Sequence, residues 1–270
     1  MRFIANARMY AVAPAAEAAW RSLIAQVAAE AAVDLDYLPY PAPLPLEDLW
    51  RRADLGCVQM CGFPIATKLA DVVPLAAPIP RAAWAQGRAV YRTDLIVRAD
   101  APFRTLADSF GGVFGWTVAH SHSGFNAPRH HLLAHRTPER PTLFRAVRGN
   151  LMTARRVLDS VRDGSIDVGP LDAYWHTLIR RHAPDLAAGV RVLESTATAP
   201  MPAFVAAPAL PAAQAAALRQ AFADAAARPW FAPLAEALLI AGFAPVDLTD
   251  FAPTLAWDAA AMQAGYLEPA

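Results

Sequence analysis

Short apolar runs of strand length alternate with amphipathic stretches of helical period along most of the chain. The runs that predict strands are residues 2–10, 33–40, 55–62, 72–80, 89–100, 113–119, 142–147, 165–172, 190–196 and 200–208. The patterns that predict helices are residues 15–31, 45–53, 105–112, 123–136, 150–164, 173–183 and 211–227, a further helix opened by Pro64, and outer helices over the last 40 residues. In the first helix the apolar stripe is Ala18, Leu23, Val27 and Ala31. Alternating strands and helices predict an α/β fold with largely parallel sheets and right-handed crossovers.

Two strand regions, near residues 91–98 and 192–206, are long enough to carry the chain from one lobe to another. This double crossing predicts a discontinuous first lobe, residues 1–92 plus 200–270, and a second lobe, residues 93–199. In open α/β sheets a ligand binds beyond the carboxyl ends of the strands. We therefore expect a ligand cleft between the two lobes.

Composition narrows the class of protein. The 270 residues are 56% hydrophobic, which suffices for a buried core, and 24 basic side chains balance 24 acidic ones. A net charge of zero indicates no broad surface for nucleic acid. The beginning, MRFIANARMYAVAP, has no apolar run typical of an export signal, and no uncharged apolar stretch is long enough to span a membrane. The expectation from the sequence as printed is a soluble chain, cytoplasmic if complete.

The two cysteines, Cys57 and Cys61, stand four residues apart in a predicted strand. Side chains at that spacing lie about 13 Å apart on one face of a strand, beyond the reach of a disulfide. Metal and redox motifs use two intervening residues instead of three. The spacing favours two buried thiols.

The stretch AHSHSGFNAPRHH, residues 119–131, carries the densest candidate chemistry. A predicted strand ends here and a helix begins between Ser121 and Ser123, followed by Gly124 and Asn126. Backbone N–H groups, small hydroxyls and the helix dipole at such a junction favour an anion. The alternative is that either serine only caps the helix.

Five of the seven histidines fall in or near the same stretch: His120, His122, His130, His131 and His135. His131 and His135 have the i, i+4 spacing of metal ligands, but the segment supplies no H-E-x-x-H pattern and no nearby acid. We therefore expect helix-surface histidines and no metal. A serine nucleophile would need a G-x-S-x-G turn, and HSHSG lacks the first glycine.

Two further junctions between a predicted strand and a predicted helix are candidate ligand contacts. Asp172 ends a predicted strand, where it can cap the next helix or receive a ligand donor, with Tyr174 as an apolar wall. Cys61, Gly62 and Phe63 end an earlier strand, where glycine permits close approach of a ligand or simply makes a tight turn.

Five stretches form an ordered set: LGCVQMCGFPIATKL, VYRTDLIVRAD, SHSGFNAPRHHL, VRDGSIDVGPLDAYWHTL and LESTATAPMPAFVA. Their order and separation resemble those of the substrate-binding proteins of phosphonate and phosphate-like ABC uptake systems. The resemblance covers about residues 50–205, and the two ends by pattern only. It implies a two-lobed fold of the periplasmic-binding-protein type, type 2, each lobe a mixed, mostly parallel sheet flanked by helices.

The resemblance also implies a function: the solute-binding component of an importer that closes on a small anion such as a phosphonate, a phosphate ester or a related oxyanion. No catalysis and no cofactor are expected, and the implied partner is a membrane permease. The resemblance further implies a periplasmic monomer. Residues carried over are Ser121, His122 and Ser123 as the anion site, Tyr91 before the crossing, Asp172 facing a ligand amine with Tyr174 beside it, and Tyr10 from the other lobe.

The chain departs from the family pattern at two places. His122 stands inside a run that is often Ser-Thr-Ser, and Asn150 and Leu151 stand where the family often has Ser-His after glycine. These changes favour a ligand other than phosphonate itself. Two other functions stay open: a cytoplasmic sensor of a metabolite, and an enzyme similar to thiamine-pyrimidine synthases, for which Lys68, the sole lysine, would have to hold a cofactor.

Overall fold

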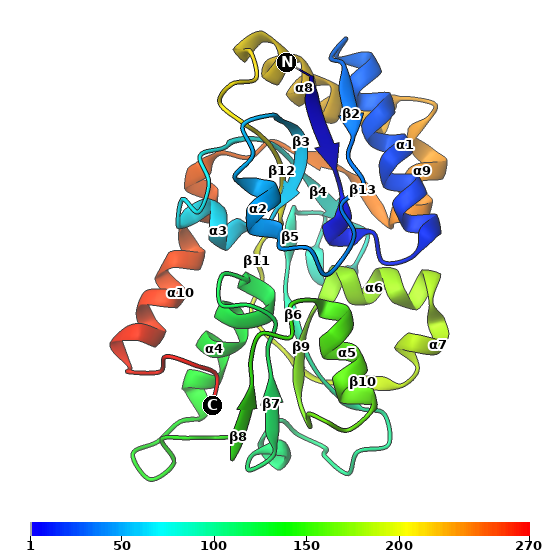
Figure 1. Ribbon diagram of the computed structural model, residues 1–270. Helices are drawn as coiled ribbons and strands as arrows, with labels where there is room; N and C mark the ends of the chain where they lie inside the picture. The colour runs from blue at the N-terminus through cyan, green and yellow to red at the C-terminus, as the bar shows by residue number, and fades with distance from the viewer. Residues whose placement is uncertain (1) are drawn as a thin grey trace. The chain divides into compact units, whose positions relative to one another are not determined.

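The computed structural model describes residues 2–270 as two compact units (Figure 1). Unit 1 contains the chain up to Tyr91 and the segment Pro200–Ala252, and unit 2 contains Arg92–Ala199 and Pro253–Ala270. The sequence assigned all of 200–270 to the first lobe. The structure groups the last 18 residues with unit 2, so the chain passes between the units three times instead of twice.

Unit 1 is built on a six-stranded sheet of order β13-β4-β12-β3-β1-β2. Its strands are β1 (Phe3–Asn6), β2 (Leu35–Tyr37), β3 (Leu55–Met60), β4 (Val73–Pro80), β12 (Ala203–Ala206) and β13 (Ile240–Ala244). Its helices are α1 (Pro14–Glu30), α2 (Leu46–Trp50), α3 (Gly62–Ala66), α8 (Ala212–Asp224) and α9 (Phe231–Leu238), with 3-10 turns that include η1 (Arg8–Tyr10) and η7 (Leu248–Phe251). Strands β1 to β4 share one direction, and β12 and β13 run against them.

Helix α1 begins with Pro14 at its first position and packs beside α9 (Figure 1). Leu23 and Val27 are buried as predicted, whereas Ala18 is exposed, because the buried stripe runs through Trp20 instead. Trp20 meets the ring of Phe204 edge-on at 5.7 Å between centroids. This aromatic contact fixes α1 against the central strand β12.

Strand β13 lies in the C-terminal region where the sequence predicted only helices. The segment Ile240–Ala244 is short, apolar and interrupted by Gly242, so its local pattern does not distinguish a strand from a helix. Its pairing with β4, some 160 residues earlier, decides the matter. Tertiary pairing therefore overrides the weak local signal.

Unit 2 holds a three-stranded sheet of order β10-β6-β9 and a two-stranded sheet of β7 and β8. The strands are β6 (Thr93–Arg98), β7 (Val113–Gly115), β8 (Ala146–Arg148), β9 (Gly169–Asp172) and β10 (Val190–Ser195). The helices are the π-helix η4 (His122–Asn126), α4 (Ala127–Leu132), the 3-10 turn η5 (Leu133–His135), α5 (Ala154–Arg162), α6 (Ala173–His182), α7 (Pro184–Ala187) and most of α10 (Ala252–Gln263). A separate two-stranded sheet pairs β5 (Val90–Tyr91) with β11 (Ala199–Pro200).

Strand β6 runs against both of its neighbours, β9 and β10, and β7 is parallel to β8 and to Val168, just before β9. Four strands of unit 2 thus share one direction and β6 opposes them. The mixed, mostly parallel α/β architecture predicted from the sequence is confirmed, and the strand by which the chain enters each unit, β6 or β12, is antiparallel to its neighbours.

The C-terminal segment joins unit 2 through polar and apolar contacts. Tyr266 lies in the core of unit 2 with Phe114, Phe125 and Phe144. The guanidinium of Arg129, whose side chain is 3% exposed, forms an ion pair with Asp258 and donates to the carbonyl of Leu267 at 3.2 Å. A buried arginine needs such partners, and the returning chain supplies the charged one, while Asn126 Oδ1 accepts a further hydrogen bond at 3.5 Å.

Among residues 2–270, no helix combines the length and the apolar character that crossing a bilayer requires.

The Arg129–Asp258 pair yields a stability prediction. Asp258→Ala leaves a buried guanidinium short of a charged acceptor, so the free energy of unfolding should fall by about 2 kcal/mol in urea denaturation. The control is Asp159→Ala, which breaks an exposed i, i+4 pair with Arg155 on α5 and should cost below about 0.5 kcal/mol. Equal losses in the two variants would contradict the claim that Asp258 holds the C-terminal segment in place.

Candidate functional site

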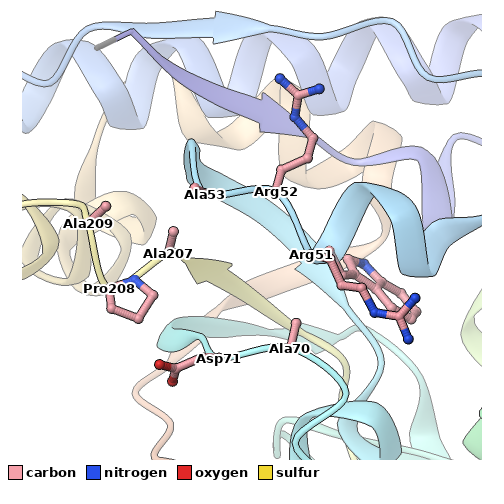
Figure 2. Close-up of a pocket in the computed structure, with 9 residues that line it drawn as sticks. Arg51, Arg52, Ala53, Ala70, Asp71, Ala207, Pro208 and Ala209 are labelled. Carbon is pink, nitrogen blue, oxygen red and sulfur yellow. The ribbon is translucent and has the colours of Figure 1, made fainter.

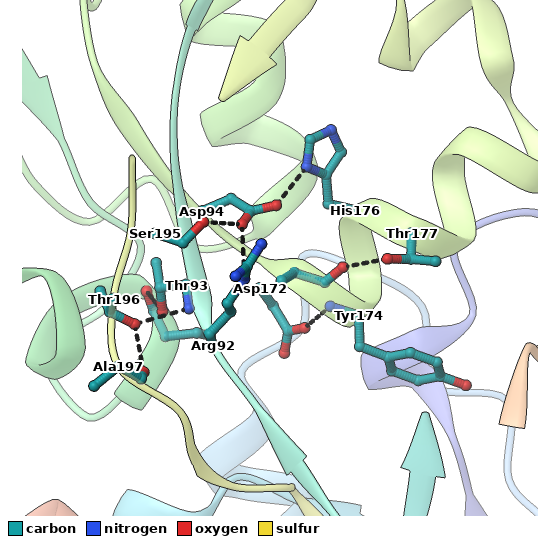
Figure 3. Close-up of polar contacts among 12 residues, drawn as sticks. Arg92, Thr93, Asp94, Asp172, Tyr174, His176, Thr177, Ser195, Thr196 and Ala197 are labelled. Carbon is teal, nitrogen blue, oxygen red and sulfur yellow. Dashed lines mark hydrogen bonds and ion pairs between the residues drawn. The ribbon is translucent and has the colours of Figure 1, made fainter. Parts of the chain in front are cut away.

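The carboxyl ends of β9 and β10 and the start of β6 meet at one edge of the sheet of unit 2 (Figure 3). Thr93 is opposite Asp172, and Asp94 is opposite Ser195. We call Thr93, Asp94, Asp172, Ser195 and Thr196 the polar edge. Because β6 is antiparallel to both neighbours, its first residues join the last residues of the other two strands.

Hydrogen bonds tie the polar edge together. Thr196 Oγ1 accepts from the backbone N–H of Thr93 at 3.0 Å, and the hydroxyl of Ser195 donates to Asp94 Oδ1 at 2.8 Å. His176 Nδ1 lies 2.9 Å from Asp94 Oδ2, and His176 is 1% exposed. Both oxygens of Asp94 are therefore engaged, which holds this side of the edge rigid.

The sequence reasoning missed Thr93, Asp94, His176, Ser195 and Thr196. The sequence carries a signal for these strand residues, because short polar runs follow Tyr91 and Leu193 in stretches that are otherwise apolar. The pairing of β6 with two distant strands was needed to bring them together.

The anion site expected from the sequence forms the π-helix η4. Ser121 Oγ accepts from the N–H of Gly124 at 3.0 Å, and the carbonyl of Ser121 accepts from the N–H of Asn126, five residues on, at 3.1 Å. Single π turns are frequent at functional sites. Ser121 and Ser123 are partly exposed, whereas His122, Gly124 and Asn126 are buried.

Thr93 connects this turn to the polar edge. Its hydroxyl donates to the carbonyl of Ser123 at 3.1 Å, while its backbone is paired with Asp172. Of the expected residues, Ser123 and Asp172 thus both contact Thr93 within unit 2.

His122 is the first residue of η4, and its buried ring packs against Trp257 of α10 at 5.1 Å between centroids. Asn126 Nδ2 lies 3.2 Å from His122 Nδ1 and donates to the carbonyl of Thr254 at 2.8 Å. The amide thus assigns Nδ1 as the acceptor and Nε2 as the protonated nitrogen. Burial, with a smaller contribution from His130, lowers the pKa of His122 to about 3. The imidazole is therefore neutral at physiological pH.

Asp172 performs the capping role that the sequence left open. Its Oδ1 accepts from the N–H groups of Tyr174 at 2.8 Å and Trp175 at 3.0 Å, which anchors the start of α6. A carboxylate has further lone pairs, so a cap does not exhaust it. Tyr174 is fully buried, and burial together with the charge of Asp172 raises its pKa well above 10.

In unit 1 the expected residues Tyr10, Cys61, Gly62, Phe63 and Tyr91 are all buried. Tyr10 and Cys61 follow the carboxyl ends of β1 and β3, which are neighbouring parallel strands. The sulfur of Cys61 lies 3.9 Å from the hydroxyl of Tyr91. Sheet pairing thus brings part of the expected set together.

Gly62 has a structural reason within unit 1. A Cβ at this position would stand 2.6 Å from Cδ1 of Phe251, so the ring of Phe251 already requires a glycine here. Cys57 and Cys61 are both buried thiols, as the sequence predicted, and no disulfide joins them. Burial raises the pKa of the Cys57 thiol.

A hollow of about 290 Å³ in unit 1 lies away from these residues (Figure 2). It is lined by Trp50, Arg51, Arg52, Ala53, Ala70, Asp71, Ala207, Pro208 and Ala209. These residues precede β3 and β4 or follow the antiparallel β12, so the hollow is at the amino ends of the parallel strands. Ligands of open α/β sheets bind at the opposite edge, beyond the carboxyl ends of the strands.

Residues 11–251 match the family of periplasmic substrate-binding proteins of phosphonate ABC transporters. The chain belongs to this family. A search of curated protein sequences finds no relative of the chain.

Solved structures share the fold at low sequence identity. A binding protein component of an ABC phosphonate transporter from Pseudomonas aeruginosa is 15% identical over 98% of this chain and 88% of its own, with a TM-score of 0.80. PhnD1 from Prochlorococcus marinus, in complex with methylphosphonate, is 12% identical over 96% and 97%, with a TM-score of 0.78. A Xanthomonas citri protein bound to ATP is 20% identical over 97% and 98%, with a TM-score of 0.65.

The second departure from the family pattern lies beside η4. The N–H groups of Leu151 and Met152 donate to the carbonyls of Trp116 and Thr117, both at 3.1 Å, and Thr117 in turn donates its N–H to Gly124 at 3.3 Å. Asn150 and Met152 adopt left-handed φ values of 55° and 67°. Backbone hydrogen bonds thus connect residues 151 and 152 to Gly124 of η4 by way of Trp116 and Thr117.

Gly124 yields a test of the packing under η4. A Cβ there would stand 1.9 Å from Thr117 Oγ1, so Gly124→Ala should lower the free energy of unfolding by about 1–3 kcal/mol in urea denaturation. Thr117→Ala in the same chain removes the hydroxyl and should restore part of the loss.

The control for that test is Gly111→Ala, where φ is 84° and nothing lies within 4 Å of the added carbon. Its cost is backbone strain of about 1 kcal/mol, which Thr117→Ala should leave unchanged. Equal rescue of both glycine variants would show that Gly124 is not constrained by Thr117.

The depressed pKa of His122 yields a pH prediction. Between pH 6.5 and 3 the unfolded chain binds a proton at His122 that the folded chain does not, so stability is present above this window and lost as pH falls through it, by up to about 1.4 kcal/mol per unit. His122→Gln should flatten the pH dependence of the urea midpoint between pH 6.5 and 4.5. A ring resonance of His122 that titrates near pH 6 in NMR spectra would contradict this prediction.

Proposed function

We propose that this chain is the solute-binding subunit of an ABC importer and that its ligand is a small phosphonate- or phosphate-type oxyanion held at the first turn of η4. Membership of the family supports the role. The observation that carries the site is the π turn that begins with two partly exposed serines, Ser121 and Ser123, of which Ser123 is hydrogen-bonded to Thr93 of the polar edge.

The donors at this turn suit an oxyanion. Hydroxyl groups and helix-start N–H groups give directional hydrogen bonds, and the helix dipole favours negative charge. His122, directly behind the turn, is neutral, so it adds no fixed positive charge. Recognition would then rest on hydrogen-bond geometry, which favours tetrahedral oxyanions over simple carboxylates.

Asp172 supplies the second element of specificity. A carboxylate close to an anion site repels a purely anionic ligand and attracts one that also carries an ammonium group. We therefore propose that Asp172 favours a ligand whose organic part bears an amine.

Two structures of similar fold were solved with methylphosphonate and with ATP. Tetrahedral phosphoryl oxygens are what these two ligands share. This supports the phosphonate or phosphate ester class for the present chain, without selecting one member of it.

The proposed setting is the periplasm, with a membrane permease as partner, one copy of the chain per ligand, no nucleic acid and no chemical change in the ligand. The family supports the location and the permease. For the competing enzyme reading, Lys68 would have to be a buried cofactor lysine, but it is exposed in a left-handed turn after α3, with φ of 56°.

The test compares matched ligands by calorimetry and thermal shift: methylphosphonate, 2-aminoethylphosphonate, phosphate, methanesulfonate and acetate. Tetrahedral phosphorus oxyanions should raise the melting temperature. Ser123→Ala should weaken all of them by on the order of 10-fold. Asp172→Asn keeps an effective helix cap and should weaken only the amine-bearing ligand.

Ser165→Ala is the matched control, because the hydroxyl of Ser165 donates to the carbonyl of Ser160 in α5. This variant should leave the ligand affinity unchanged. Ligand recovered from the protein should show an unaltered phosphorus NMR spectrum. No response to any of the five ligands would overturn the proposal, and a changed spectrum would favour an enzyme.

A further inference from the structure

We propose that unit 2 binds a divalent transition-metal ion, with zinc as the expected metal, between His131, His135 and Glu194. One ligand atom from each of these side chains lies within 4.8 Å of the others. The sequence supplied two histidines at i, i+4 spacing but no acid near them. The fold supplies the acid from β10, about 60 residues later in the chain.

The spacing of the ligand atoms is close to that of a coordinated set. His131 Nε2 lies 3.0 Å from Glu194 Oε1. In a tetrahedral zinc site with bonds of about 2.1 Å, neighbouring ligand atoms are separated by about 3.4 Å. His131 Nε2 is buried and is paired with the carboxylate of Glu194, so the two ligand atoms already face each other.

The donor set selects the metal class. Two imidazoles and one carboxylate are typical of zinc and related ions, whereas calcium and magnesium require mainly oxygen ligands.

The surroundings position His135 and engage nearby arginines. The ring of His135 packs edge-on against Phe110 at 5.4 Å, and the guanidinium of Arg140 lies over the same Phe110 ring at 5.8 Å. Arg136 donates to the carbonyls of Pro141 and Ala264, and Arg191 to those of residues 99, 101 and 103. All three ligands are half-buried, so an ion would have access and partial desolvation.

The strand is irregular where the acid stands. The register of β10 on β6 shifts between Val192, opposite Ile96, and Glu194, opposite Leu95. Such bulges redirect side chains and recur next to functional sites. Bound metal would link β10 to the α4–η5 segment, which directly follows η4.

The experiment is zinc titration of the chelator-treated full chain by calorimetry at pH 7.5, with no phosphonate or other organic ligand present. One ion per chain is expected. His135→Gln and Glu194→Gln should each weaken binding by on the order of 10- to 100-fold or more, since removal even of supporting groups around a metal costs that much. Binding should also weaken at pH 5.5, because protons compete for the histidines.

His130→Ala is the matched control: it removes the adjacent imidazole, which stacks on Trp257 at 4.9 Å and is not among the three proposed ligands. It should retain zinc affinity. Circular dichroism and urea unfolding without metal establish that each variant is folded. No zinc binding, or binding that His135→Gln and Glu194→Gln leave unchanged, would overturn the proposal, and neither result bears on oxyanion binding at η4.

Discussion

The pairing of β6 with β9 on one side and β10 on the other is the constraint on which the candidate site depends. Because β6 opposes both neighbours, its first residues lie at their carboxyl ends. Thr93 therefore reaches Asp172 through the sheet and Ser123 through its hydroxyl. A strand in the opposite direction would place Arg98 at this point and Thr93 at the other end of the sheet.

The second constraint is the return of the C-terminal segment to unit 2. Helix α10 supplies the carbonyl of Thr254 to Asn126, the carboxylate of Asp258 to Arg129 and the ring of Trp257 to His122. Polar groups under η4 would be buried without these partners, at a cost of about 1–3 kcal/mol for each unsatisfied group. The shape of η4 is thus maintained by residues that are more than 120 positions away.

The electrostatics of unit 2 follow from burial. Burial keeps the imidazole of His122 neutral within η4. The two carboxylate oxygens of Asp94 interact with Ser195 and His176. Arg92 adds a positive charge at the polar edge, where its Nε lies 3.6 Å from Asp94 Oδ1. Charge in this part of unit 2 is thus balanced locally, as in a chain whose net charge is zero.

The sequence by itself determined the elements with strong local signals. Helix α1 follows from Pro14 and its apolar stripe, β3 from a continuous apolar run, and the turn at Ser121 from small polar residues after a strand. Periodicity and capping act over a few residues, so one sequence suffices to predict them. The ordered motifs added the family and, with it, the two-lobed α/β class.

Only the tertiary structure decided what depends on distant partners. Pairing with β4 makes Ile240–Ala244 a strand, and residues 253–270 belong to unit 2. The ring of His122 packs on Trp257, and Glu194 lies beside His131 and His135. Each outcome is a contact between segments whose separation along the chain carries no periodic signal. The physical reason is that sheet register and buried polar pairing are satisfied across the whole unit, whereas helix and turn preferences are satisfied locally.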